Sequence, residues 1–329
     1  MAASLAGSWF LLDQISTLKG NQIILETKIS EQNESIKQYL AKQEQLSASL
    51  GTLEAEKQNA LREVNKLRKT TGAGMMDCKN ALVEADGNFD SAIEILRKKG
   101  QKVAAKRADR ESSEGVAISV TNSKNTSGVG VVLACETDFV GKNADFIDLA
   151  HKIAIIGLKC DSKESLLKEN LEEMSVEEKL IEQTGVIGEK IQINDFVRID
   201  AAYVGTYIHA GNKISSLVGF SDKSENIETA GKDIAMQIAA MNPIALDESS
   251  VDSNVIEKEI EIAKDQLRAE GKPEQMLDKI AEGKLKRFFK DNTLINQVFI
   301  KDSKLNVSQY LSTYGSNLSI TSYHRVSIG

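Results

Sequence analysis

Residues 115–135 read GVAISVTNSKNTSGVGVVLAC, and this stretch decides the class of fold. Apolar residues alternate along it over 116–120 and again over 129–135. A period of two is typical of a β-strand, and the polar residues 122–128 between the two runs are typical of a turn. The stretch therefore predicts a β-hairpin. Residues 145–158 follow with the spacing of a helix, so we expect an α+β fold.

The same order of strand, strand and helix recurs further along the chain. Residues 132–138, VLACETD, align with residues 216–222, SLVGFSD, at an offset of 84, and the helices that follow align at an offset of 85. Near-equal offsets indicate two copies of one unit. Chance similarity between common helical residues is the alternative. The two copies would cover residues 115–158 and 200–240 of a core that spans 115–329.

A pair of helices is expected after Pro243. Apolar residues recur at helical spacing on both sides of the turn Gly271-Lys272-Pro273, which predicts an antiparallel helical hairpin over 251–290. A charged hairpin with a narrow apolar stripe either projects to contact another protein or packs as ordinary core. The other core segments are expected to be an acidic helix pair at 166–184 and strands at 189–198 and 319–327.

A small helical unit is predicted ahead of the core, at residues 63–101. Its first helix ends where residues 70–74 supply two glycines, and its third helix has Gly100 as a C-terminal stop. Three short helices have a small core, and such a unit usually works as a docking module. The alternative is that the helices simply pack together and have no docking role. The charged residues 102–114 are expected to form a linker that is either flexible or helical.

Residues 1–62 are expected to form a helical or coiled-coil extension, and the chain is polar and periodic from residue 13 to about residue 64. From Leu25 to Leu53, steps of four and three residues alternate over nine positions, of which seven are apolar and Gln32 and Gln43 are not. That pattern fits a dimeric coiled coil. It fits a solvated helix without a partner about equally well, because a glycine lies within it and a lysine interrupts it beyond.

Composition disfavours several classes of function. The 329 residues carry 41 Lys and Arg against 48 Asp and Glu, a net charge of −7, which argues against direct binding of nucleic acid. Three cysteines without a C-x-x-C spacing argue against a disulfide framework and a zinc site, and they fit a cytoplasmic protein. No run of 18 apolar residues exists, so no membrane contact is expected. No metal and no cofactor is predicted.

Signatures of catalysis are missing from the sequence. It holds no phosphate loop G-x-x-x-x-G-K-[ST], no G-x-G-x-x-G after a strand, no H-E-x-x-H and no G-x-S-x-G. The histidines, His151, His209 and His324, lie far apart and are expected to be structural rather than general bases. An enzyme with an unrecognised site would have to turn over a substrate on its own. The chain is therefore interpreted as a protein that works by binding rather than as an enzyme.

One unusual spot is Thr137-Asp138-Phe139-Val140. It presents a carboxylate and a large aromatic ring side by side, directly after an alternating strand. Phenylalanine at a strand exit is normally core, and aspartate there normally caps a helix. Alternatively, the two residues form a loop tip that enters a partner's cleft. Phe139 would then be the anchor, and Asp138 would compete for a polar contact within the cleft.

Several motifs resemble those of the elongation factor Ts family. Residues 64–79, VNKLRKTTGAGMMDCK, are similar to the family's N-terminal ubiquitin-associated-like module, and TDFV at 137–140 is similar to its second signature. Residues 207–209 and 271–286 add agreement. The resemblance covers about residues 64–329 in family order. It does not extend to the segment before them, for which no function is implied.

The resemblance implies guanine nucleotide exchange on the GTPase elongation factor Tu, by binding and without covalent chemistry. In that role the tip at 137–140 would disturb the magnesium and phosphate site of the GTPase and weaken GDP binding. The alternative function is a non-catalytic scaffold built from the helical bundle and the coiled coil, and a homodimer through the core or the N-terminal coil stays open. Further partner contacts are implied for Leu67, Arg68, Met75 and Met76 in the N-terminal module and for His209, Ile187 and Gly188 in the core.

Overall fold

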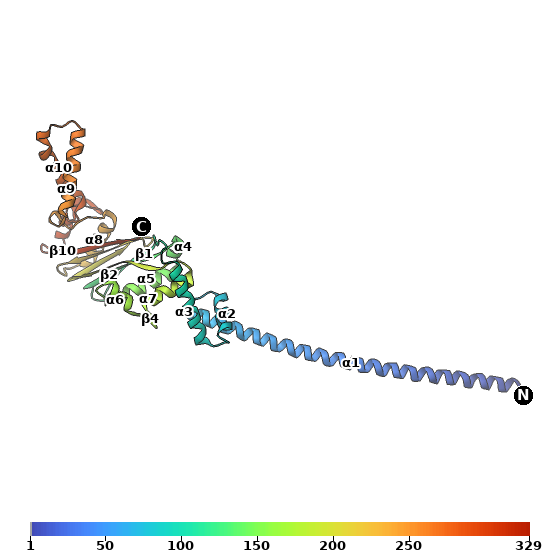
Figure 1. The fold of residues 1–329 in the computed structure, drawn as a ribbon. Coiled ribbons are helices and arrows are strands. Elements are labelled where there is room, and N and C mark those ends of the chain that lie inside the picture. Colours follow the sequence, from blue (N-terminus) through green and yellow to red (C-terminus); the bar gives the residue numbers. More distant parts are fainter. Residues whose placement is uncertain (1) are drawn as a thin grey trace. The chain divides into compact units, whose positions relative to one another are not determined.

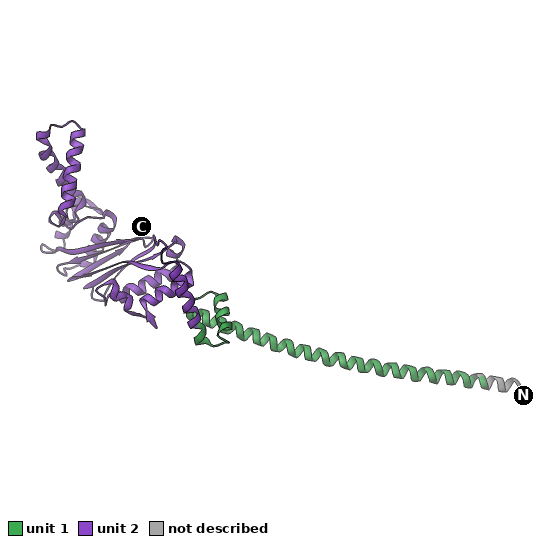
Figure 2. Cartoon of the chain, in the orientation of Figure 1, with its two compact units in different colours: residues 1–92 green, residues 93–329 purple. Residues whose placement is uncertain are grey.

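The computed structural model describes residues 2–329 (Figure 1). The chain divides into two compact units, Met1–Ala92 and Ile93–Gly329, which Figure 2 colours separately. The first unit is helical, and the second combines helices with antiparallel strands. The fold is therefore α+β, as expected.

The first unit is a long helix followed by a small helical bundle. Helix α1 covers Ala2–Thr71, α2 covers Met75–Glu84, and α3 begins at Phe89. The backbone turns after α1 at Gly72, whose φ is +69°. Leu67, Cys78 and Ala92, one from each helix, are fully buried. The first helix of the bundle is thus the end of α1, and no break separates it from the residues before it.

Helix α3 runs from Phe89 to Lys106, so the predicted stop at Gly100 is wrong. Gly100 is buried and faces Gly185 of helix α7, which covers Val176–Ile187. A side chain on Gly185 would overlap the Cα atom of Gly100, so the two helix backbones are in direct contact. Gly100 therefore allows α3 and α7 to pack closely and does not end the helix. The first residues of the expected linker, as far as Lys106, are helical.

The rest of that segment is fastened to the core. Arg107 donates hydrogen bonds to both carboxylate oxygens of Glu136, at 2.7 and 2.9 Å. The Lys190 Nζ atom donates to the carbonyl oxygens of Ala108 and Arg110, at 2.7 and 3.0 Å. Residues 107–110 are consequently held in place and do not form a free linker.

The first half of the core is a three-stranded antiparallel sheet with helices on one face. Its order is β1-β2-β5, with β1 at Glu114–Thr121, β2 at Ser127–Cys135 and β5 at Gln192–Asp200. The short helix α4 (Asp138–Gly141) follows β2, and α5 (Ala144–Gly157) packs on the sheet through Phe146 and Ile153. The segments between β2 and β5 that complete this half are α5, α6 (Lys163–Lys168), β3 (Asn170–Leu171), β4 (Met174–Ser175) and α7.

The second half of the core has the same build. Strands β6 (Tyr203–Ile208), β7 (Ile214–Phe220) and β10 (Ile320–Ser327) form a sheet with β7 in the middle, and helix α8 (Ile227–Met241) packs on it. In both sheets the second strand of a hairpin lies centrally and pairs with a strand that comes after the helix. The likeness between the two halves therefore includes a third strand, which lies outside the aligned sequences.

The two sheets pack face to face, so the layers of the core are helix, sheet, sheet and helix (Figure 1). Ile199 of the first sheet packs with Val204 and Leu217 of the second. A side chain at Gly128 of β2 would meet both Val204 and Leu217, so this glycine lets the sheets approach closely. Every residue of β2 is buried.

Helices α9 (Ser253–Ala269) and α10 (Glu274–Asn292) form an antiparallel hairpin that extends from the core (Figure 1). Leu267 and Leu277 are buried along it. At its base, Ala245, Val251 and Phe289 pack together. The remaining elements are a short 3₁₀ helix (Glu248–Ser250), β8 (Val298–Phe299), β9 (Asp302–Asn306) and α11 (Val307–Ser312).

We expect Gly185→Ala to destabilise the second unit, because the added methyl group has to push α3 and α7 apart. The expected loss in the free energy of unfolding is about 1–3 kcal/mol. Gly283→Ala is the matched control, since nothing lies within 4 Å of a side chain at this position of α10. There alanine should stabilise the helix by up to about 1 kcal/mol. Urea unfolding measures both, and equal effects would contradict the tight helix contact.

Candidate functional site

Helix α4 carries Phe139 into solvent. It begins immediately after β2, the strand that is buried along its whole length, and Phe139 is 83% exposed. The next residue, Val140, turns inward and packs against the core of the first sheet. Because its side chain is this exposed, the interpretation of Phe139 as a core residue is wrong. We call Thr137 to Val140 the α4 tip; Phe139 is exposed, and the other three residues are partly buried.

The Asp138 side chain is 42% exposed and is paired with Lys142, the residue that follows α4. Lys142 Nζ lies 2.6 Å from Asp138 Oδ2. The hydrogen bond from the Lys142 ammonium holds the pKa of Asp138 below its usual range, and the same bond raises the pKa of Lys142. Both groups are therefore charged at neutral pH. A partner that offers Asp138 a donor has to compete with Lys142.

Two glutamates hold the base of the α4 tip, and we call this pair the carboxylate clamp. Glu189 Oε2 accepts hydrogen bonds from the backbone N–H groups of Glu136 and Thr137, at 3.1 and 3.0 Å. Its Oε1 atom accepts one from Thr137 Oγ1 at 2.7 Å. In return, Glu136 Oε1 accepts from the backbone N–H of Lys190 at 2.7 Å. Each segment thus supplies a carboxylate to the backbone of the other.

Arg107 completes the clamp from a third segment by its bonds to both oxygens of Glu136. The backbone N–H of Lys190 and the Arg107 guanidinium together hold the pKa of Glu136 below its usual range. Hydrogen bonds to an ionised group are stronger than neutral ones, so the clamp is stiff at neutral pH. The side chains of the clamp were not found from the sequence, where nothing marks two glutamates 53 residues apart as partners.

Ile187 and Gly188 lead directly into the clamp. Helix α7 ends at Ile187, whose side chain packs on the core of the first sheet. Gly188 follows with φ of +80°, a left-handed conformation that favours glycine and ends the helix. The turn delivers Glu189 to the α4 tip. The structure therefore brings these two predicted contact residues close to Thr137.

His209 follows the last residue of β6 and is exposed. Its Nδ1 atom lies 3.1 Å from the Tyr207 hydroxyl. The turn that it begins is joined to the start of β1, because Asn212 accepts a hydrogen bond from the Ala117 N–H at 2.6 Å and Lys213 pairs with Glu114 at 2.7 Å.

The α4 tip adjoins that same strand end. Gly141, the last residue of α4, packs against Gly115. Lys213 helps to lower the pKa of Asp138, and Glu114 helps to raise that of Lys142. The first residues of β1 therefore support both the α4 tip and the turn that holds His209.

The predicted contact residues of the first unit divide into two groups. Leu67 has no exposed surface, so its assignment to a partner contact is corrected: it belongs to the core of the bundle. Arg68 at the end of α1 and Met75 and Met76 at the start of α2 are exposed. These three remain available to a partner. Flexible methionine side chains adapt readily to a binding surface.

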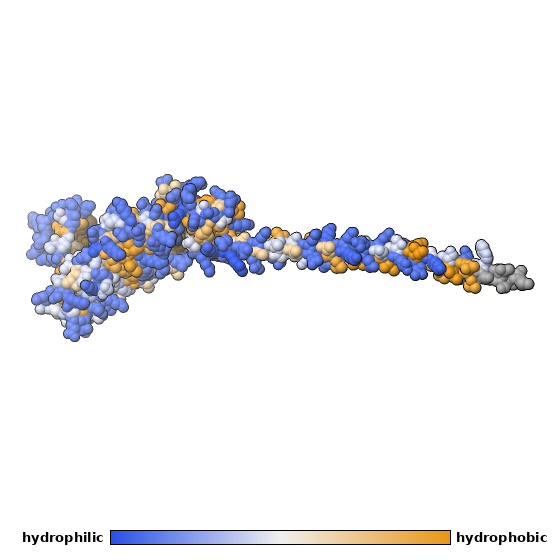
Figure 3. All heavy atoms as spheres, turned by 90° about the horizontal axis from the view of Figure 1, so that it is seen from below, coloured by the Kyte–Doolittle hydropathy of each residue, from blue (hydrophilic) through white to orange (hydrophobic). Residues whose placement is uncertain are grey.

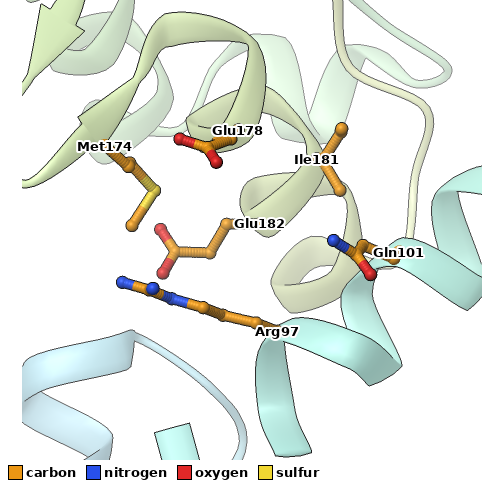
Figure 4. Close-up of a pocket in the computed structure, with 6 residues that line it drawn as sticks. All are labelled: Arg97, Gln101, Met174, Glu178, Ile181 and Glu182. Atoms are coloured by element: carbon orange, nitrogen blue, oxygen red, sulfur yellow. The ribbon is translucent and has the colours of Figure 1, made fainter. Parts of the chain in front are cut away.

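Two pockets beside α7 are small. One of about 60 Å³ lies between α3 and α7, where Arg97 and Glu182 face each other (Figure 4). Another of about 260 Å³ is lined in part by Ala104 and Lys190. Pockets for small molecules usually measure about 300–1,000 Å³. Among residues 2–329, no three His, Cys, Asp or Glu side chains are grouped as a metal site, and no helix is long and apolar enough to cross a bilayer.

Comparison with known proteins matches this chain to translation factors. The family model for elongation factor Ts matches residues 136–329. An elongation factor Ts from Christiangramia forsetii is 62% identical over 267 residues, which are 81% of this chain and 97% of that protein. The elongation factor Ts of Flavobacterium psychrophilum is 58% identical over the same shares of the two chains. That of Amoebophilus asiaticus is 47% identical over 270 residues, 81% of this chain and 98% of that protein.

These matches make the chain a translation elongation factor. More closely, the chain belongs to the elongation factor Ts family, since the family model covers more than half of it and nearly the whole of each relative is matched. The resemblance to this family is thereby confirmed, and the family model includes residues 137–140.

We expect Glu189→Ala to loosen the α4 tip, because it removes three hydrogen bonds and leaves two backbone N–H groups without their acceptor. The expected loss in the free energy of unfolding is about 2 kcal/mol. Glu173→Ala, at an exposed glutamate, should change stability by less than about 0.5 kcal/mol. Urea unfolding compares the two, and hydrogen exchange at Thr137 reports the tip directly. Unchanged exchange at Thr137 would contradict the clamp.

The thiols should not react in the folded protein. Cys135 is buried and donates a hydrogen bond to the Thr137 carbonyl at 3.1 Å. Burial, together with the charge of Glu189, raises the pKa of Cys135 to about 12, and burial also raises the pKa of Cys78 and Cys160. Only the thiolate is nucleophilic. Ellman's reagent at pH 8 should therefore label none of the three until denaturant is added, and rapid labelling of the native protein would show that this packing is wrong.

Proposed function

We propose that the chain is the guanine nucleotide exchange factor of elongation factor Tu. It acts by binding and performs no covalent chemistry. Membership of the elongation factor Ts family supports the partner, and the exposed Phe139 supports the mode of action. Its place of action is the cytoplasm, where translation takes place.

In this proposal the α4 tip enters the GTPase near its magnesium and phosphate site. Phe139 supplies the apolar anchor, since its ring is already free of the core. Asp138 exchanges its bond with Lys142 for a polar group of the GTPase. The displaced contacts are those that hold the magnesium ion and the phosphates of GDP, so nucleotide binding weakens.

Exchange then follows from linkage. A factor that binds the nucleotide-free GTPase more tightly than the GDP form must weaken GDP binding by the same factor, and rebinding of GTP releases the factor again. The tip has to be stiff for this coupling, because a tip that yields on contact would leave the GTPase unchanged. The carboxylate clamp provides that stiffness at the base of α4.

Two further surfaces hold the complex together. Arg68, Met75 and Met76 of the first unit bind the GTPase domain. His209, Ile187 and Gly188 contact it next to the α4 tip, since the turn of His209 and the tip share support from the start of β1 and Gly188 precedes the clamp.

Release of a fluorescent GDP from elongation factor Tu tests the proposal with the full chain. Wild type should accelerate release. Phe139→Ala and Asp138→Ala should each slow the accelerated rate, the first by at least about tenfold, because truncation of a central aromatic anchor costs 2 kcal/mol or more. Both should leave the urea midpoint nearly unchanged, since the two side chains are exposed.

Ile155→Ala is the control for this experiment. Ile155 is also an exposed apolar residue, on α5, and its loss should leave the exchange rate as in wild type. No acceleration by the wild-type chain would overturn the proposed function. Wild-type rates in both tip variants would overturn the role of the tip while leaving the exchange activity in place.

A further inference from the structure

Helix α1 exposes an apolar stripe that nothing in its own unit covers. From Leu11 to Leu53 its large apolar side chains are at least 45% exposed, and in Figure 3 orange residues recur along the helix among blue ones. Long helices of soluble proteins usually gain their stability from packing of such a face. A face of this size in water is the usual mark of an interaction surface.

The stripe follows a heptad pattern over residues 11–53, about six heptads. With Ile29 placed at position a, the a positions hold isoleucine at 15, 29 and 36 and leucine at 50. The d positions hold leucine at 11, 18, 25, 46 and 53 and tyrosine at 39. All of these side chains are exposed. Three or four heptads of this kind already indicate a coiled coil.

We propose that residues 11–53 pair with the same residues of a second copy of this chain, as a parallel two-stranded coiled coil. Isoleucine at a with leucine at d is the combination that favours parallel dimers over trimers and tetramers. The inference does not depend on the exchange activity.

Three glutamines within the stripe select the alignment. Gln22 and Gln43 occupy a positions and Gln32 occupies a d position. In a parallel dimer in register, each of them faces its own copy, and each amide can bond to its counterpart. In an antiparallel pair, a positions face d positions, so Gln32 can meet only one of the other two and an amide is left against an apolar side chain. The polar residues therefore favour the parallel alignment in register.

Charges beside the stripe are compatible with two identical chains. In a parallel dimer a g position faces the e position five residues further along the partner helix. Lys28 then faces an asparagine at position 33, Lys42 faces a serine at position 47, and Glu54 faces a serine at position 49. None of these pairs sets like charges against each other, so a homodimer meets no electrostatic penalty there.

The sequence also ends the coil before the helical bundle. Lys57 occupies the next a position and Ala60 the next d position. The same phase then continues to Val64 and Leu67, which are buried within the bundle of the first unit. That part of the stripe is already covered, so pairing stops near Leu53. In a parallel dimer both bundles leave the coil at the same end.

Light scattering on the full chain tests the pairing. The measured mass of the wild type should be twice the 36.0 kDa mass of one chain. The double variant Ile29→Asp with Ile36→Asp should elute as a monomer, because it places charges at two successive a positions. The matched control is Ile23→Asp with Ile24→Asp, which changes two equally exposed isoleucines at the outward b and c positions and should remain a dimer.

Disulfide cross-linking tests the alignment. Leu25→Cys should form a cross-linked dimer on mild oxidation, since each Leu25 faces its own copy only in the parallel alignment. Thr27→Cys, at an outward f position, should not, and the three native thiols are buried. A monomeric wild type would overturn the proposal, as would a dimer that survives Ile29→Asp with Ile36→Asp and so forms through another surface. A dimer without cross-linking at position 25 would overturn the parallel alignment.

Discussion

The burial of β2 on both faces is the constraint on which the core depends. One face of this strand packs against α5 and the other against the second sheet. On the face toward the second sheet, Gly128 and Gly130 leave Leu217 in direct contact with the strand, since a side chain at either glycine would overlap it. Any larger residue there would separate the sheets. Since β2 cannot move, the chain that leaves it at Cys135 starts from a fixed point.

The α4 tip benefits from that fixed point and from the clamp that follows it. Glu136 and Thr137 leave the sheet with their N–H groups bonded to Glu189, and the Glu136 carboxylate is bonded to Lys190 and Arg107. These bonds draw three segments together at one place, the end of α3, the exit of β2 and the end of α7. An exposed aromatic ring on a mobile loop would bind a partner more weakly, because ordering the loop on binding costs entropy. Here that ordering is complete before a partner arrives.

The sequence predicted the elements that depend on local periodicity and failed where two distant segments meet. The hairpin at 115–135 was correct, because alternation is a local property. In β2, however, the alternation arises from a face of large residues and a face of mostly small ones, both buried, and not from a buried and a solvated face. From the sequence alone, a glycine that ends a helix cannot be told from a glycine at which two helices pack together. The role of Gly100 is therefore clear only from the structure, in which it contacts Gly185 of α7.

The candidate site shows the same division. The tip at 137–140 could be found from the sequence, because an acid and an aromatic residue next to each other after a strand form a local pattern. Leu67 was misplaced because the family motif at 64–79 marks residues that shape the bundle as well as residues on its surface, and burial alone separates them. The clamp has no local pattern at all. In the proposed function the protruding side chain needs a stiff support more than a pocket. That support is built from residues far apart in the chain, where sequence patterns carry the least information.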